Sequence, residues 1–405
     1  MNIHVRTLSV SLLAVLVLSA CSKKQETPAQ SQAPQPLMVK IGQASPLTGP
    51  QAAIGKDNEN GARLAIEDAN AAKIKIDGRE VRFELMSEDD QADPKQGTLV
   101  AQKFVDAKVN AVVGHLNSGT SIPASKIYSD AGIAQVSPSA TNPAYTHQGF
   151  KTTFRVMAND EQQGKALAQF AASSLKAKTV AVIDDKTAYG EGLAGEFSKM
   201  AAASGIKVVA TEHTDDKSVD FAAILTKIKA TKPDIVFYGG MYPQAGPMVS
   251  QMKKLSIPAR LLTGDGGCAV EFLNLAGAAA EGHYCSLPGV PLDKMPGGAK
   301  FEAHFKTRFN IGIQQYAPNA YDAVMVVVEA IKRANSADPA KIVAELPKTS
   351  YAGVTSSALA FDANGDIKDG AVTIYQYTGG AKVAVETIGG VPAAAAEPAK
   401  PSGPY

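Results

Sequence analysis

The sequence predicts an α/β protein of two lobes, each built on a parallel β-sheet with helices beside it. Strand-like and helix-like segments alternate along the chain, and this βαβα order is typical of doubly wound parallel sheets. The chain has 405 residues, which is more than one hydrophobic core usually serves. The alternating pattern also begins again after about residue 158, so we expect two lobes of similar plan.

The first run of this pattern lies between residues 39 and 137. Short apolar or alternating runs predict the strands, and apolar residues at helical spacing predict the helices. Asp93 and Pro94 mark one helix start, because proline is favoured in the first helical turn and aspartate before it. The strands are expected at residues 39–44, 81–86, 111–113 and 133–137, and the helices at residues 55–72, 93–107 and 122–131.

The second run begins with an amphipathic helix and repeats the same order. The segment 320–334 adds a strong helix, with apolar side chains at helical spacing from Tyr321 to Ile331. The strands are expected at residues 179–183, 206–211 and 234–238, and the helices at residues 161–175, 193–204, 221–230 and 320–334.

The N-terminus predicts export. Arg6 precedes an apolar stretch from residue 8 to residue 20, which is shorter than the roughly 20 residues that span a bilayer but fits a secretory signal. The sequence Leu-Ser-Ala-Cys at residues 18–21 resembles the lipobox of bacterial lipoproteins, so residues 1–20 are expected to be a signal peptide and Cys21 to be lipidated. An ordinary signal peptide that contains a cysteine is the alternative.

Two further segments are too polar or too rich in Ala and Pro to fold by themselves. Residues 21–37 are expected to be a flexible tether, and residues 391–405 a disordered tail.

The formal net charge of +1 gives no electrostatic basis for binding nucleic acid. No apolar run after Ala20 is long enough to cross a membrane, so the membrane is expected to be reached through the lipid anchor only.

The cysteines and histidines bear on covalent and metal chemistry. In an exported protein, Cys268 and Cys285 are expected to form a disulfide, with two buried thiols as the alternative. The six histidines are scattered and suggest no metal site.

Residues 190–195 (GEGLAG) match a dinucleotide-binding motif formally, but six residues separate their first glycine from the strand end. We therefore expect no cofactor and no enzymatic activity.

A set of short stretches, in this order and spacing, resembles the leucine/isoleucine/valine-binding proteins from about residue 38 to residue 380. The stretches are residues 91–96 (QADPKQ), 114–119 (GHLNSG), 137–143 (SPSATNP), 185–192 (DKTAYGEG), 238–240 (YGG) and 361–366 (FDANGD). The resemblance implies a type I periplasmic binding protein with two Rossmann-like lobes and a ligand cleft between them.

The resemblance also implies three hinge crossings, near Ala158, Pro288 and Ala371. Lobe 1 would comprise residues 38–158 and 288–370, and lobe 2 residues 159–287 and 371–390. Together with the lipobox, the resemblance leads us to expect a monomeric periplasmic lipoprotein. It would capture leucine, isoleucine, valine or a related small-molecule amino acid by lobe closure and deliver it to an inner-membrane ABC permease.

A free amino acid presents a carboxylate, an ammonium group and a side chain. For the carboxylate we expect Ser118 and Thr141, because each carries a hydroxyl just after a strand, where open α/β sheets bind ligands. Ser118 also precedes a helix, whose free amides favour an anion. The family resemblance implies the same pair, with Ser139 and Ala140 lining the turn. The alternative is that Ser118 merely caps the helix.

For the ammonium group we expect Asp265, because the glycines beside it let the backbone approach a ligand closely. An Asp-Gly turn is the alternative. The family usually carries glutamate in this role, and aspartate is one methylene shorter, which leaves the identity of the ligand open.

Other ligand contacts follow from the resemblance. It implies that Tyr189 closes over the ligand from the second lobe, and that Met241 or Tyr242 occupies an aromatic position. Ile54 stands where some members carry tyrosine, which suggests a more apolar wall. Packing within a lobe is the alternative for each. The same fold could also serve a sensor or importer of an amide, a urea or an aromatic acid.

Overall fold

The computed structural model describes residues 35–368 and 370–390 of the chain. The predicted signal peptide, the lipidation site Cys21, most of the tether and the tail 391–405 lie outside these residues. Leu37, the last residue of the expected tether, already lies in the first strand. None of the helices in the described part of the chain is long and apolar enough to cross a membrane.

The first sheet has the strand order β2-β3-β1-β4-β5-β6 within the described residues. Parallel pairing runs from β3 through β1, β4 and β5 to β6, while β2 forms an antiparallel hairpin with β3. These strands are β1 (Leu37–Ser45), β2 (Lys75–Ile76), β3 (Arg79–Asp89), β4 (Ala111–Gly114), β5 (Ala134–Ser137) and β6 (Thr153–Arg155).

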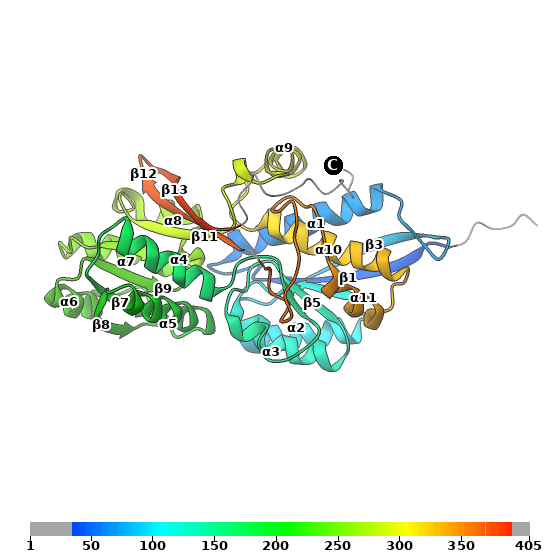
Figure 1. Ribbon diagram of the computed structural model, residues 1–405, viewed down its shortest axis with the longest axis horizontal. Coiled ribbons are helices and arrows are strands. Elements are labelled where there is room, and N and C mark those ends of the chain that lie inside the picture. The colour runs from blue at the N-terminus through cyan, green and yellow to red at the C-terminus, as the bar shows by residue number, and fades with distance from the viewer. Residues whose placement is uncertain (1–34, 369, 391–405) are drawn as a thin grey trace, which may run out of the picture. The chain divides into compact units, whose positions relative to one another are not determined.

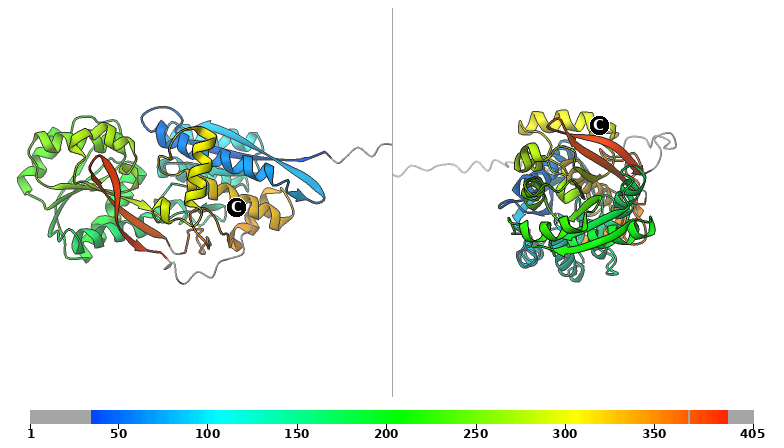
Figure 2. Two further views of the ribbon diagram at one scale, coloured as in Figure 1. Left: turned by 90° about the horizontal axis from the view of Figure 1, so that it is seen from above. Right: turned by 90° about the vertical axis from the view of Figure 1, so that its left-hand side faces the viewer.

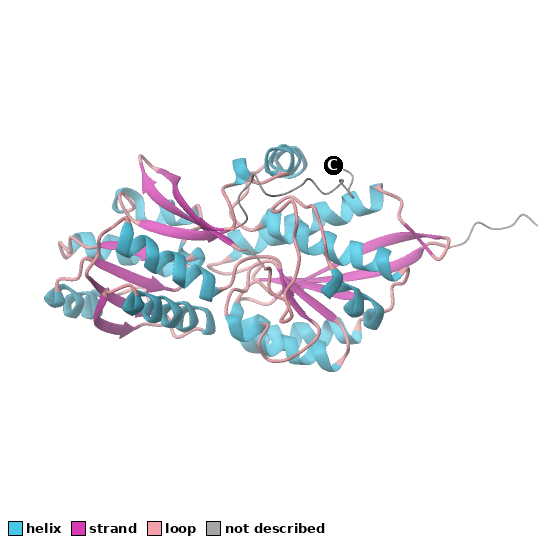
Figure 3. Cartoon of the chain, viewed as in Figure 1, coloured by secondary structure: helices cyan, strands magenta, loops and turns pink. Residues whose placement is uncertain are grey.

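Helices cover both faces of this sheet, as Figure 3 shows. Ala111 and Val113 of β4 belong to the core that contains α1 and α10, whereas Val112 between them belongs to the core beneath α2 and α3. This alternation is expected of a strand that is buried on two faces. The helices are α1 (Ala52–Ala71), α2 (Pro94–Asp106), α3 (Ser118–Asp130), α9 (Gly298–Phe309), α10 (Ala317–Ala334) and α11 (Pro339–Glu345).

The second sheet has the order β13-β12-β11-β10-β9-β7-β8 within the described residues. The pairs from β8 to β11 are parallel, but β12 and β13 are antiparallel to their neighbours. The strands are β7 (Thr179–Asp184), β8 (Lys207–His213), β9 (Ile235–Gly239), β10 (Arg260–Thr263), β11 (Tyr284–Pro288), β12 (Ala371–Thr378) and β13 (Ala381–Gly389).

The expectation of purely parallel sheets is therefore corrected at one edge of each sheet. Figure 2 shows the β12–β13 hairpin in red beside the second sheet. Gly379 and Gly380 join its strands with φ angles of 59° and 75°, a left-handed backbone that glycine adopts at low cost and that tight hairpin turns require. The predicted α/β fold class itself is confirmed by the two doubly wound sheets.

The helices beside the second sheet enclose a large core that includes Phe197 and Phe237, whose rings stack with centroids 3.9 Å apart. Asn159 and Gln162 form a reciprocal capping box at the start of the first of these helices. The helices are α4 (Asp160–Ser173), α5 (Ala188–Ala203), α6 (Ala222–Thr231), α7 (Tyr242–Lys254) and α8 (Glu271–Ala276).

The chain passes between the two sheets at three places along its length (Figure 1). It leaves the first sheet after β6 and enters α4, and it returns after β11 to α9 and α10, which packs on α1. It crosses again before β12, which pairs with β11. For brevity we call the first sheet with α1, α2, α3 and α10 lobe 1, and the second sheet with α4 to α8 lobe 2. The exact lobe boundaries and their action as hinges stay predictions.

A disulfide joins Cys268 to Cys285 and confirms the predicted pairing. Cys268 directly follows the short 3-10 helix η2 (Asp265–Gly267), and Cys285 lies in β11. The bridge therefore fastens the segment that carries Asp265 to the centre of the second sheet.

Candidate functional site

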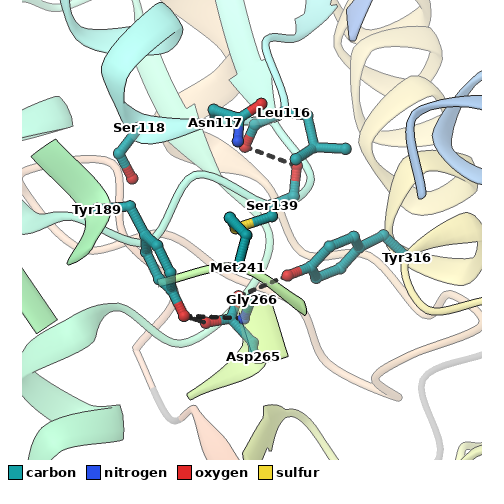
Figure 4. A pocket seen from close by; sticks show the side chains of 9 residues that line it. All are labelled: Leu116, Asn117, Ser118, Ser139, Tyr189, Met241, Asp265, Gly266 and Tyr316. Carbon is teal, nitrogen blue, oxygen red and sulfur yellow. Dashed lines mark hydrogen bonds between the residues drawn. The ribbon is translucent and has the colours of Figure 1, made fainter. Parts of the chain in front are cut away.

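A cavity lies where the carboxyl ends of strands from the two lobes face one another, which is where open α/β sheets hold ligands. The cavity is narrow in this structure, with a volume of about 10 Å³. Figure 4 shows the side chains that line it. They are Leu116, Asn117, Ser118, Ser139, Tyr189, Met241, Asp265, Gly266 and Tyr316.

Lobe 1 contributes a helix start to this cavity. The helix α3 begins at Ser118, four residues before the predicted start, and retains Pro123 in its interior. Asn117, not Ser118, occupies the N-cap position, and the Ser118 hydroxyl accepts a 3.1 Å hydrogen bond from the backbone N–H of Asn142. Because the first N–H groups of a helix lack partners within it, this end of the cavity suits an anion.

The turn after β5 forms the neighbouring wall. The Ser139 hydroxyl lines the cavity, donates to the Leu116 carbonyl at 3.1 Å and accepts from the Asn58 amide at 3.2 Å. Ala140 and Thr141 are fully buried beside it but are not among the lining residues. The Thr141 hydroxyl makes no hydrogen bond within the described residues.

A buried arginine fixes the backbone of the turn after β5. The guanidinium group of Arg155 donates to the carbonyl oxygens of Ala140 and Asn142, at 2.6 and 3.1 Å, and to Oδ1 of Asp366 at 2.6 Å. Arg155 is fully buried. Bonds of a charged donor in such a setting are strong, so the backbone of the turn is held in one conformation.

Lobe 2 contributes a buried carboxylate that several neutral groups surround. Asp265 is 1% exposed. Its Oδ1 accepts from the Tyr189 hydroxyl at 2.8 Å and from the Gln163 amide at 2.9 Å, and its Oδ2 accepts from the Tyr316 hydroxyl at 2.6 Å. In Figure 4 the two tyrosines point toward Asp265 from opposite sides.

The electrostatic setting of Asp265 is unusual for a carboxylate. Burial raises the pKa of Asp265, and the hydrogen bonds from Tyr316, Gln163 and Tyr189 offset only part of that effect. No ion pair joins Asp265 to a cation in residues 35–368 or 370–390. Burial of an uncompensated charge is costly, so this group is suited to a cation supplied by a ligand.

Gly266, the residue after Asp265, allows this segment to pack closely against Tyr189 and Met241 of lobe 2. A Cβ atom on Gly266 would lie 2.6 Å from Cε1 of Tyr189 and 2.7 Å from Sδ of Met241. The N–H group of Gly266 donates to the Tyr189 hydroxyl at 2.8 Å. The glycines beside Asp265 predict a close approach of the backbone to a ligand, and in the structure the close approach is to Tyr189.

The apolar candidates divide between the cavity and the surrounding core. Met241, the N-cap residue of α7, lines the cavity. Tyr242 instead donates its hydroxyl to the Pro50 carbonyl at 2.7 Å, a contact from lobe 2 to lobe 1. Ile54 is fully buried in the core cluster and is not a lining residue. Of the open pair, Met241 is thus the residue that faces the cavity.

Sequence reasoning reached five of the lining residues and missed others. The structure brings together Ser118, Ser139, Tyr189, Met241 and Asp265, while Ala140, Thr141, Tyr242 and Ile54 stand outside the lining. The missed lining residues are Leu116, Asn117, Gly266 and Tyr316. Gln163, whose side-chain amide donates a hydrogen bond to Asp265, was also missed.

The glycine motif at residues 190–195 has a different setting from a phosphate-binding loop. Its glycines lie inside α5, whose N-cap is Thr187. A dinucleotide loop needs the first glycines before the helix, where their N–H groups point at the pyrophosphate. In the described part of the chain, no cluster of three or more His, Cys, Asp or Glu is arranged to hold a metal ion.

Two α/β lobes line one cavity. A helix start and hydroxyl groups lie on one side of it, and a buried carboxylate lies on the other. This arrangement is typical of a protein that binds a small solute. Comparison with known proteins agrees. The chain belongs to the periplasmic binding protein family, whose family model matches residues 38–382.

Relatives and solved structures extend over nearly the same part of the chain. The leucine-, isoleucine-, valine-, threonine- and alanine-binding protein of Pseudomonas aeruginosa is 36% identical over 339 residues, which is 84% of this chain and 90% of that protein. The structure of a leucine-binding protein from Thermotoga maritima has a TM-score of 0.80 at 30% identity, with 86% of this chain and 98% of that chain covered.

A further solved structure contains its ligand. The branched-chain amino acid transporter substrate-binding protein of Streptococcus pneumoniae, in complex with isoleucine, has a TM-score of 0.79 at 29% identity. The match covers 87% of this chain and 99% of that chain.

Proposed function

We propose that the protein is the substrate-binding component of an ABC importer and binds leucine, isoleucine, valine or a related α-amino acid. The observation that carries this proposal is the buried carboxylate of Asp265, which has hydrogen-bond donors but no cation among the described residues. An α-ammonium group supplies the missing charge. The helix start at Ser118, across the cavity, is suited to the α-carboxylate.

The apolar side chains of the cavity support an aliphatic ligand. Leu116 and Met241 line it together with the rings of Tyr189 and Tyr316. Binding sites of this kind combine an apolar wall with a few placed polar groups that fix orientation. The relatives named for leucine, isoleucine and valine bind ligands of that chemistry, and this supports the same class here.

The location of the protein follows from the same reading. We propose that it acts in the periplasm, anchored through a lipid on Cys21, and passes its ligand to an inner-membrane permease as a monomer. The tether of residues 21–37 would give the anchored protein reach toward the permease.

An amide, a urea or an aromatic acid is the alternative ligand class for this fold. None of these carries an ammonium group, so each would leave Asp265 buried without a counter-charge. That cost disfavours them relative to an α-amino acid.

A thermal-shift screen against the twenty amino acids tests the proposal. A ligand at 100 times its dissociation constant stabilises the protein by about 2.7 kcal/mol. Leucine is compared with two analogues that each lack one charge, 4-methylpentanoate without the ammonium and leucinamide without the carboxylate. We expect leucine, isoleucine or valine to raise the midpoint clearly and both analogues to have little effect. Equal stabilisation by 4-methylpentanoate, or no response to any amino acid, would contradict the proposal.

A further inference from the structure

A second carboxyl group lies beside Asp265 and has no place yet in the site. Gln163 donates from the same Nε2 atom to Oδ1 of Asp265 at 2.9 Å and to Oδ1 of Asp160 at 3.2 Å. Both carboxyl groups are buried, with exposures of 1% and 0%. Oδ2 of Asp160 has no hydrogen-bond partner within the described residues.

The groups that face this carboxyl pair come from several elements. Tyr189 of α5 and Tyr316, next to α10, donate to Asp265. Arg155 of β6 is the nearby cation, but its guanidinium group is committed to Asp366, Thr146 and two turn carbonyls. The pair Asp160–Asp265 is therefore bridged by a neutral amide and lacks a cation of its own.

Two carboxyl groups that share one neutral donor in a buried place cannot both ionise without a counter-charge. We infer that the pair Asp160–Asp265 holds one proton in the ligand-free protein, and that the ammonium group of an entering amino acid displaces this proton to solvent. The inference rests on the proposed function. The exchange balances: the O–H bond of the protonated carboxyl group breaks and the proton passes to buffer. Two carboxylates then remain beside one ammonium group, so the net charge of the buried pair with its cation stays the same.

Asp160 is the member of the pair that is suited to carry the proton. Burial, and next to it the charge of Asp265, raises the pKa of Asp160 to about 8. The backbone N–H of Asp160 donates to the Thr141 carbonyl at 2.9 Å. Asp160 therefore lies between Asp265, which is proposed to bind the ammonium group, and the turn beside the proposed carboxylate site. A group with that pKa is about nine-tenths protonated at pH 7.

Proton release makes binding dependent on pH in a defined direction. Because the bound state carries fewer protons, affinity rises with pH. The dissociation constant should fall by up to about tenfold per pH unit between pH 6 and 8 and should level off above that range.

Calorimetry with leucine as the probe measures the released proton directly. Titrations at pH 7 in phosphate, HEPES and Tris give an observed enthalpy that depends linearly on the ionisation enthalpy of the buffer, and the slope with its sign reversed is the number of protons released. We expect about 0.9 proton per leucine for the wild type. Asp160→Asn should give a slope near zero. Glu161→Gln, which alters the exposed neighbouring carboxylate, should keep the wild-type slope.

Each outcome decides a separate point. Binding of leucine with a zero slope in the wild type overturns the inference and leaves the proposed function intact. A slope that persists in Asp160→Asn shows that the proton comes from another group and overturns the assignment. If leucine, isoleucine and valine all fail to bind, the proposed function fails and this inference with it. Should Asp160→Asn not fold, the wild-type slope and the affinity measured from pH 6 to 8.5 still decide.

Discussion

The Tyr316 hydroxyl donates a 2.6 Å hydrogen bond to Oδ2 of Asp265, across 51 positions of sequence and from one lobe to the other. Tyr316 immediately precedes α10, which packs on α1, and Asp265 follows β10 of the second sheet. The amide of Gln315 adds a 2.8 Å bond to the Asp265 carbonyl. The carboxylate proposed for the ammonium group is therefore also a contact between the lobes.

Removal of the Tyr316 hydroxyl should weaken ligand binding. Tyr316→Phe deletes one of the three hydrogen bonds to the carboxylate, and this bond is also a contact between the two lobes. A hydrogen bond to a charged group contributes roughly 1.5–3 kcal/mol, so affinity for leucine should fall by at least about tenfold. Calorimetry with leucine measures this loss.

Tyr242→Phe is the matched control. It also deletes a bond between the lobes, to the Pro50 carbonyl, but one that does not involve Asp265. It should cost less affinity than Tyr316→Phe. An equal loss in both variants would show that lobe contact alone, without support of the carboxylate, accounts for the effect.

The buried pair of Arg155 and Asp366 should contribute strongly to stability. Asp366→Asn leaves the guanidinium group with a neutral partner, and breaking a buried ion pair in this way costs about 3–5 kcal/mol. Urea unfolding at pH 7 measures the change in the free energy of unfolding. Asp130→Asn, which breaks the exposed pair with Lys126, should cost no more than about 1 kcal/mol. Similar losses in the free energy of unfolding for the two variants would contradict a strong contribution of the Arg155–Asp366 pair to stability.

The same pair predicts a pH dependence of stability. Burial acts to raise the pKa of Asp366, but the charge of Arg155 and the hydrogen bonds from Arg155, Thr146 and Asn159 together outweigh it. The pKa of Asp366 therefore lies below its ordinary value. A depressed pKa gives stability that is present above the unfolded-state value, near 3.9, and is lost as the pH falls through the folded-state value. The difference in unfolding free energy between wild type and Asp366→Asn should therefore shrink below about pH 4. A constant difference from pH 7 to pH 3 would refute this.

The disulfide should stabilise both the fold and the ligand segment. Cys268 and Cys285 are 17 positions apart, and closure of such a loop is worth about 3 kcal/mol in the chain-entropy account. The double variant Cys268→Ala, Cys285→Ala should lose about that much stability in urea unfolding. It should also bind leucine more weakly, because Cys268 follows η2 directly. Unchanged affinity would show that η2 is held by other contacts.

The lipid anchor is tested at the N-terminus itself. The sequence at residues 18–21 predicts cleavage before Cys21 and a lipid on its sulfur. Mass spectrometry of protein purified from membranes should find a modified Cys21 as the first residue, and Cys21→Ala should abolish the modification. A mature chain that begins at any other residue would rule the anchor out.

The fold was predictable because local patterns determine it. The strand β4, buried on both faces, and Pro94 at the start of α2 carry their signals within a few residues. The start of α3 at Ser118 was missed because Pro123 reads as a first-turn residue, whereas the helix tolerates it in its interior.

The site was predictable only in part, because half of it depends on contacts between distant segments. Asp265 stands out as an acid among glycines after a strand. Gln163 lies 102 positions away from it on the face of a helix, and its role follows only from how α4 packs in the fold. Tyr316 and Asp160 likewise look like an ordinary tyrosine and an ordinary helix-start aspartate until the structure brings them to Asp265.

The exchange of Asp265 for asparagine tests the central claim most directly. Asp265→Asn keeps the shape of the side chain but removes the charge that faces the ammonium group. Calorimetry with leucine, isoleucine and valine should show an affinity loss of about ten- to a hundredfold, because a charged hydrogen bond is worth roughly 1.5–3 kcal/mol. Asp293→Asn, an exchange at an exposed position, should bind like the wild type. If Asp265→Asn binds all three amino acids as tightly as the wild type, the ammonium group is held elsewhere and the proposed site is wrong.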